Sequence, residues 1–147
     1  MPSRSALLHA AAEAGACYFA AVYAAGFVLG AIRVMIIAPR IGETIAVLLE
    51  APVILAISWA VARRMTRWRG VPADLAPRLL MGLVAFVLLM LAELVVSTLV
   101  FHRSVIDHVS AYGSSAGAIG LVAQFAFAAL PALQAWWDDT SREKSDA

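Results

Sequence analysis

Four long apolar segments restrict the fold of this chain more than any other feature of its sequence. They run over about residues 14–38, 41–61, 79–101 and 116–136. A helix rises about 1.5 Å per residue, so each segment can cross a hydrocarbon core roughly 30 Å thick. Lipid cannot satisfy a free backbone, and the two-residue alternation of a transmembrane barrel is absent. We therefore predict an all-α, four-helix transmembrane bundle.

The composition excludes a water-soluble globule. Of the 147 residues, 63% are hydrophobic and only 14% are charged, whereas soluble domains have about 45–50% apolar and about 25% charged residues. The polar residues are too few to cover the surface of such a globule. We expect one membrane domain at 1–137, with the first apolar segment retained as a helix, and a polar cytoplasmic tail without regular structure at 138–147.

Positive charges are unevenly shared between the two sides of the predicted bundle. The connection between the second and third segments holds five arginines, and the two ends of the chain add Arg4, Arg142 and Lys144 on the same side. The five in the connection are Arg63, Arg64, Arg67, Arg69 and Arg78. The opposite side holds Arg40 and Arg103, with Arg33 partly within the membrane. Short basic loops stay in the cytoplasm, so we predict that both termini are cytoplasmic. Four tryptophans fall at that same interface, where such rings are favoured, namely Trp59, Trp68, Trp136 and Trp137. The abundance of alanine, and of arginine over lysine, is typical of a GC-rich bacterial genome. We therefore expect a multi-pass protein of the bacterial inner membrane.

An arginine and a carboxylate flank the tight turn at residues 39–42, which joins the first two segments. Arg33 and Glu43 fall at nearly one depth in this hairpin, and their opposite charges predict a salt bridge. Gly26 and Gly30 share the face of Arg33 and form a GxxxG pattern, which lets a second backbone approach closely. We expect this face to pack on the second segment. The functional alternative makes Arg33 an anion or substrate contact.

Two further carboxylates lie deep in the second and third segments. Glu50 and Glu93 are each about 20 Å from the predicted cytoplasmic edge, by the helical rise. An ionisable group there costs roughly 2.5–3.5 kcal/mol on insertion scales, so it needs a physical reason. Pro52 should kink the second helix beside Glu50 and free a backbone carbonyl.

These groups allow two interpretations. If Glu50 and Glu93 face each other, they extend Arg33 and Glu43 into a ladder typical of a proton relay or a cation site. In the structural alternative Arg33 pairs with Glu50, and Glu43 lies at the interface. Glu93 then hydrogen-bonds to Ser58 or Ser97. The cluster then only fixes the register of the helices.

The stretch GAIRVMIIAPRIGETIAVLLEAPVILAISWAVARR, from Gly30 to Arg64, carries the one resemblance. It is similar to a pattern in uncharacterised small four-span bacterial inner-membrane proteins, and it covers about a quarter of the chain. The resemblance implies no activity. It groups six residues as one unit, namely Arg33, Pro39, Arg40, Glu43, Glu50 and Pro52.

The third connection adds two weaker signals. Gly113 and Gly117 form a second GxxxG pattern, which favours helix packing within the chain or with another subunit. His102, Asp107 and His108 are too few for a typical metal site, and a solvated loop is the favoured interpretation. We predict no metal, no cofactor and no nucleic-acid partner.

The function predicted from these features is that of a non-enzymatic accessory or scaffold subunit of a membrane complex. The motifs of serine hydrolases and phosphate-binding enzymes are absent from the sequence. The alternative is an oligomeric proton- or cation-coupled transporter or channel that uses Glu50 and Glu93. The expected partners are the lipid bilayer and either further copies of this chain or a larger membrane-protein complex.

Overall fold

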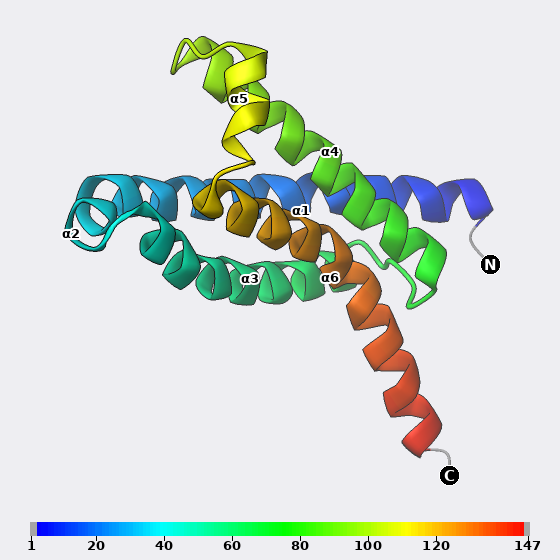
Figure 1. The fold of residues 1–147 in the computed structure, drawn as a ribbon. Coiled ribbons are helices and arrows are strands. Elements are labelled where there is room, and N and C mark those ends of the chain that lie inside the picture. Colours follow the sequence, from blue (N-terminus) through cyan, green and yellow to red (C-terminus); the bar gives the residue numbers. More distant parts are fainter. Residues whose placement is uncertain (1–2, 146–147) are drawn as a thin grey trace.

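The computed structural model describes residues 3–145, and the side chains of residues 3–138. Regular structure in residues 3–145 is entirely helical (Figure 1). The elements are α1 (Arg4–Ile32), η1 (Arg33–Ile37), α2 (Ala38–Ile41), α3 (Glu43–Trp68), α4 (Leu75–Leu99), α5 (Val105–Ala111) and α6 (Ser115–Ser145). Four stretches within 3–145 are long and apolar enough to cross a membrane, at Arg4–Ile41, Glu43–Trp68, Leu75–Leu99 and Ser115–Asp138. This confirms the prediction of an all-helical chain with four candidate spans.

Several helix ends differ from the predicted ones. The first helix begins at Arg4, because the Ser3 hydroxyl caps it by accepting from the backbone N–H of Ala6. The expected tail is helical through Ser145, since a polar sequence can continue a helix beyond the apolar stretch; residues 146–147 lie outside the described residues. The short α5 lies in a connection that we expected to be a loop.

The four long helices form a ring in which each packs on two others. Helix α1 contacts α3 and α4, and α6 contacts the same two helices. In Figure 1, α4 crosses α1, and the last turns of α6 extend beyond the other helices. In the core the Tyr18 ring stacks on Phe127 at 4.4 Å between ring centroids, and its hydroxyl donates to the Phe127 carbonyl at 3.0 Å. An aromatic pair thus ties α1 to α6 across the ring.

Two glycines let the helices approach closely. A Cβ at Gly15 would lie 2.5 Å from the Met81 carbonyl oxygen of α4, and one at Gly82 would lie 2.0 Å from the Ala128 carbonyl oxygen of α6. No side chain fits in either space. Small residues at helix contacts are typical of membrane bundles, because backbones can then pack at short range. Neither position belongs to a GxxxG pattern.

Two of the four ion pairs among residues 3–138 lie at the end of the bundle that carries both termini, which we call the basic end (Figure 1). Arg69 at the end of α3 pairs with Glu13 of α1 at 2.8 Å, and Arg63 pairs with Asp138 of α6 at 3.2 Å. Arg78 is buried in the first turns of α4, where its Nε donates to the Pro72 carbonyl at 2.9 Å. The basic connection between α3 and α4 is therefore folded against the bundle.

Candidate functional site

The hairpin turn is built from a widened helix followed by a single glycine. The backbone N–H of Ala38 donates to the Arg33 carbonyl, five residues earlier, so residues 33–37 form one π turn. Pro39 comes two residues after Ile37, the last residue of this π turn. The proline ring has no N–H to donate, and the wider turn moves the preceding carbonyls away from the ring. Gly42 then reverses the chain with φ 85° and ψ 155°, a conformation that only glycine adopts readily.

This turn delivers Arg33 to two carboxylates of α3. Its Nε lies 2.6 Å from Glu50 Oε2, and its Nη1 lies 3.6 Å from Glu43 Oε1. Arg33 and Glu50 are 22% and 18% exposed, whereas Glu43 is 71% exposed. The expected Arg33–Glu43 pair is thus present, but the shorter and less exposed contact is the one with Glu50. Both pairs join the two arms of the hairpin.

Glu93 lies in a separate cluster, formed by α4, α6 and the segment around α5. The Gln124 side-chain amide donates to Glu93 Oε1 at 2.7 Å, and the Tyr112 hydroxyl donates to Glu93 Oε2 at 3.2 Å. The same hydroxyl lies 3.3 Å from His108 Nε2. We call Glu93, Gln124, Tyr112 and His108 the Glu93 cluster. It holds Glu93 with neutral donors.

The ladder of four charged groups is therefore not formed. Glu50 is held by Arg33 of its own hairpin, and Glu93 is held by Gln124 and Tyr112. The serine partners suggested for Glu93 are also not used, since Ser58 donates to the Ile54 carbonyl and the Ser97 hydroxyl is buried without a hydrogen bond. The reason is positional, because among the described residues the donors that reach Glu93 come from α6 and the segment around α5.

Helix α5 is ordered by its own N-terminus. The Ser104 hydroxyl and backbone N–H both hydrogen-bond to the Asp107 carboxylate, and the Asp107 backbone N–H donates to the Ser104 hydroxyl. These bonds from Ser104 hold the pKa of Asp107 below its usual value. They also turn His108 toward Tyr112, one helical turn later, with the two rings edge to face.

The position of Tyr112 changes its acidity. Burial is the largest cause, and the neighbouring negative charge of Glu93 and the hydrogen bond to it add to the effect. Together they raise the pKa of Tyr112 to about 12. The phenol therefore keeps its proton at physiological pH and can donate to the carboxylate.

The glycine patterns contribute less to helix packing than expected. A Cβ at Gly26 would meet Ile54 of α3 at an ordinary 3.7 Å, and one at Gly30 would meet nothing within 4 Å. Gly30 therefore makes no close contact with another helix. It lies two residues before the end of α1, where the π turn begins. A Cβ at Gly113 would lie 3.2 Å from the Ser110 carbonyl oxygen, and one at Gly117 would lie 2.1 Å from the Ala111 carbonyl oxygen. Both glycines therefore pack on the C-terminal end of α5.

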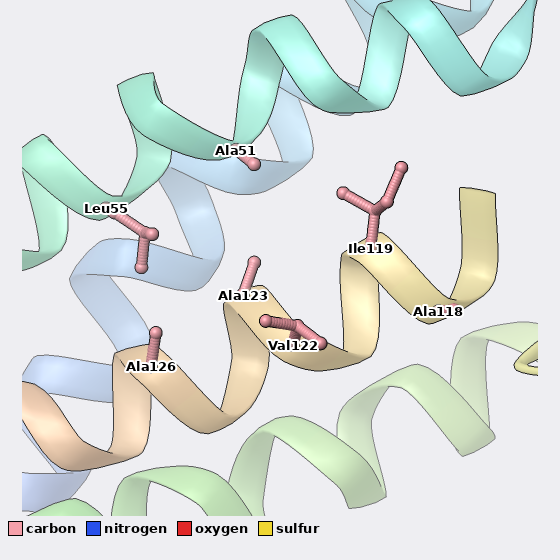
Figure 2. Close-up of a pocket in the computed structure, with 7 residues that line it drawn as sticks. All are labelled: Ala51, Leu55, Ala118, Ile119, Val122, Ala123 and Ala126. Carbon is pink, nitrogen blue, oxygen red and sulfur yellow. The ribbon is translucent and has the colours of Figure 1, made fainter. Parts of the chain in front are cut away.

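Pro52 lies inside α3, and the helix continues through it from Glu43 to Trp68. Ala51 and Leu55, on either side of Pro52, line an apolar groove of about 330 Å³ between α3 and α6. Figure 2 shows the side chains of both helices pointing into this space. Its lining is Ala51, Leu55, Ala118, Ile119, Val122, Ala123 and Ala126.

Gln124 and Tyr112 were not among the predicted site residues. The predicted polar cluster consisted of ionisable residues and contained no amide, although Gln124 is a polar residue in the middle of an apolar segment. Gln134 was missed for the same reason; it is buried and donates to the Trp59 carbonyl at 2.8 Å. The weak metal candidates are used otherwise, since Asp107 bonds to Ser104 and His108 to Tyr112.

Comparisons of the chain with protein-family models, with curated proteins and with solved structures found no match.

Proposed function

We propose that this chain is a multi-pass membrane protein that serves as a non-enzymatic scaffold subunit of a membrane complex. Four helices of sufficient length and apolarity support the membrane location. The arginines at the basic end favour a cytoplasmic position for both termini, in a bacterial inner membrane. The partner in this proposal is a transmembrane helix of another subunit.

The groove between α3 and α6 is the observation that carries the proposal. Four of its seven lining residues are alanines, Ala51, Ala118, Ala123 and Ala126. It extends over nine residues of α6, from Ala118 to Ala126, which is about 12 Å or two helical turns. Apolar burial does not drive association in lipid, so close backbone packing at small residues takes its place. A groove of this length and lining suits one helix of a partner.

The ion pairs of the hairpin support a structural role for its charges. Arg33 is placed between two carboxylates, and its contact with Glu50 is short and mostly shielded. A charge-assisted hydrogen bond of this kind holds two helices in one register. The groove begins at Ala51, directly after Glu50, so the same ion pair fixes the α3 wall that a partner would meet.

The test fills the groove and measures the assembly. Ala123→Phe places a large ring in it, and Ala24→Phe is the matched control on an exposed face of α1. The tagged chain is extracted in mild detergent, and the complex is sized by native electrophoresis. A photo-crosslinker at position 123 then identifies the contact.

We expect the wild type and Ala24→Phe to run as one larger complex, and Ala123→Phe to run as the folded chain alone. A crosslink to a second copy would identify a homo-oligomer, and a crosslink to another protein would identify a hetero-complex. A complex unchanged by Ala123→Phe, or a crosslink to lipid only, would refute the scaffold role of the groove.

One observation favours the second candidate, an oligomeric proton- or cation-coupled transporter or channel. Glu93 is bound by neutral donors, whereas Glu50 is neutralised by Arg33. A carrier role would thus fall to Glu93. Proton and sodium flux into liposomes that depends on Glu93, and that Glu50→Gln leaves intact, would favour transport over the scaffold.

A further inference from the structure

Among the carboxylates described in the four long helices, Glu93 is the one without an arginine partner. The structure pairs Glu13, Glu43, Glu50 and Asp138 with arginines. Glu93 instead receives one amide and one phenol hydrogen bond. An ionised carboxylate in such surroundings has an uncompensated charge, and the direct way to remove it is to take up a proton.

A path for that proton is built into the cluster. Tyr112 Oη lies 3.3 Å from His108 Nε2 and 3.2 Å from Glu93 Oε2, so one hydroxyl bridges the imidazole and the carboxylate. A phenol can donate one hydrogen bond and accept another at the same time. With the proton on Nε2, the imidazole donates to Tyr112 while Tyr112 donates to Glu93.

The segment around α5 places this path at the exposed C-terminal end of α4. His108 belongs to a helix whose other residues are exposed, including Ile106 at 80%. Glu93 lies six residues before the end of α4, which is about 9 Å along its axis. The imidazole thus stands between the surface and a half-buried carboxylate.

We propose that Glu93 is a proton-binding site, loaded from the end of the bundle opposite the basic end through His108 and Tyr112. The imidazolium of His108 releases its Nε2 proton to Tyr112 Oη, and the phenol releases its own proton to Glu93 Oε2. One N–H and one O–H bond break and two O–H bonds form, so a charged pair becomes a neutral pair. Bulk water reprotonates His108. The site does not depend on the scaffold role.

The other groups near Glu93 leave its charge uncompensated. Helix α1 contributes Tyr23, a neutral phenol within electrostatic range of Glu93, and α6 contributes the uncharged Gln124. Around α5, Asp107 is engaged with Ser104, and the adjacent cation is Arg103, which interacts electrostatically with Asp107. His108 is therefore the basic side chain that faces Glu93 through a hydrogen-bonded path.

Infrared spectroscopy of the full chain in lipid nanodiscs tests this site. The C=O stretch of a protonated carboxyl is followed from pH about 4 to about 9, which spans ordinary and raised carboxyl pKa values. Rapid pH jumps give the rate at which this band appears. The variants are Glu93→Gln, Tyr112→Phe and, as a matched control on the other buried carboxylate, Glu50→Gln.

We expect a titrating band that Glu93→Gln removes and Glu50→Gln retains. Tyr112→Phe should keep the band and slow its appearance by about a hundredfold, the lower range of what a positioned proton donor contributes. A band that survives in folded Glu93→Gln would assign the proton elsewhere and overturn the proposal. An unchanged rate in Tyr112→Phe would overturn the path, and this comparison stays decisive if Glu93→Gln does not fold.

Discussion

Gly82 allows the sharpest test of the helix packing. A methyl group at this position would lie 2.0 Å from the Ala128 carbonyl oxygen, whereas ordinary contacts of this kind begin at about 3.4 Å. In Gly82→Ala, α4 and α6 must therefore move apart by roughly 1 Å or more along this line. Such overpacking costs about 1–3 kcal/mol. Alanine also favours a helix over glycine by about 1 kcal/mol, which hides part of the loss.

Gly30→Ala separates the two effects. It gains the same helix propensity, but its new Cβ meets nothing within 4 Å. The difference in unfolding free energy between the two variants should therefore equal the steric cost, about 1–3 kcal/mol, with Gly82→Ala the less stable. Tryptophan fluorescence during denaturation in detergent micelles measures this difference. Equal stability of the two variants would refute the close packing of α4 on α6.

Three further predictions concern the hairpin and α5. Glu50→Gln should lower the unfolding free energy by about 3 kcal/mol, because it breaks a shielded ion pair. Glu43→Gln should lower it by less than about 1 kcal/mol, because Glu43 is exposed. The same denaturation measures both variants. Gly42→Ala should cost about 1–3 kcal/mol in this assay, because its φ of 85° and ψ of 155° strain any side chain. The hydrogen bonds from Ser104 lower the pKa of Asp107 in the folded chain. They therefore stabilise α5 fully at a pH above the ordinary carboxyl pKa of about 3.9. This stabilisation is lost as the pH falls through the lowered pKa of folded Asp107. NMR titration of that carboxyl should show a higher pKa in Ser104→Ala, and an unchanged pKa would contradict the capping interaction.

Contacts within the hairpin could be predicted from the sequence because a short turn fixes the register of its two arms. Arg33 and Glu43 flank this turn, so their depths follow from counting residues along two antiparallel helices. Glu50, farther along the second arm, was the alternative partner predicted for Arg33. The structure contains both pairs, and it adds the π turn that aims the guanidinium at α3. Sequence alone gave no sign of that turn beyond Pro39.

Contacts between helices that are not consecutive could not be predicted in this way. Equal depth made Glu50 and Glu93 possible partners, but depth leaves the rotation of each helix about its axis open. Nearly all sides of these helices are apolar, so hydrophobic periodicity does not reveal which face lies inside. Gly15 and Gly82 mark the inner faces in the structure, and neither belongs to a recognisable pattern.

The different surroundings of Glu50 and Glu93 follow from the same distinction. Glu50 meets an arginine because the hairpin carries its own counter-charge across a short turn. Glu93 lies on α4, whose one other charged side chain, Arg78, is fifteen residues away near the basic end. Its partners must come from α6 and the α5 segment, and both supply neutral donors. In the hairpin, Glu50 therefore holds two helices together through its ion pair with Arg33. On α4, Glu93 has neutral partners, so a proton can remove its charge.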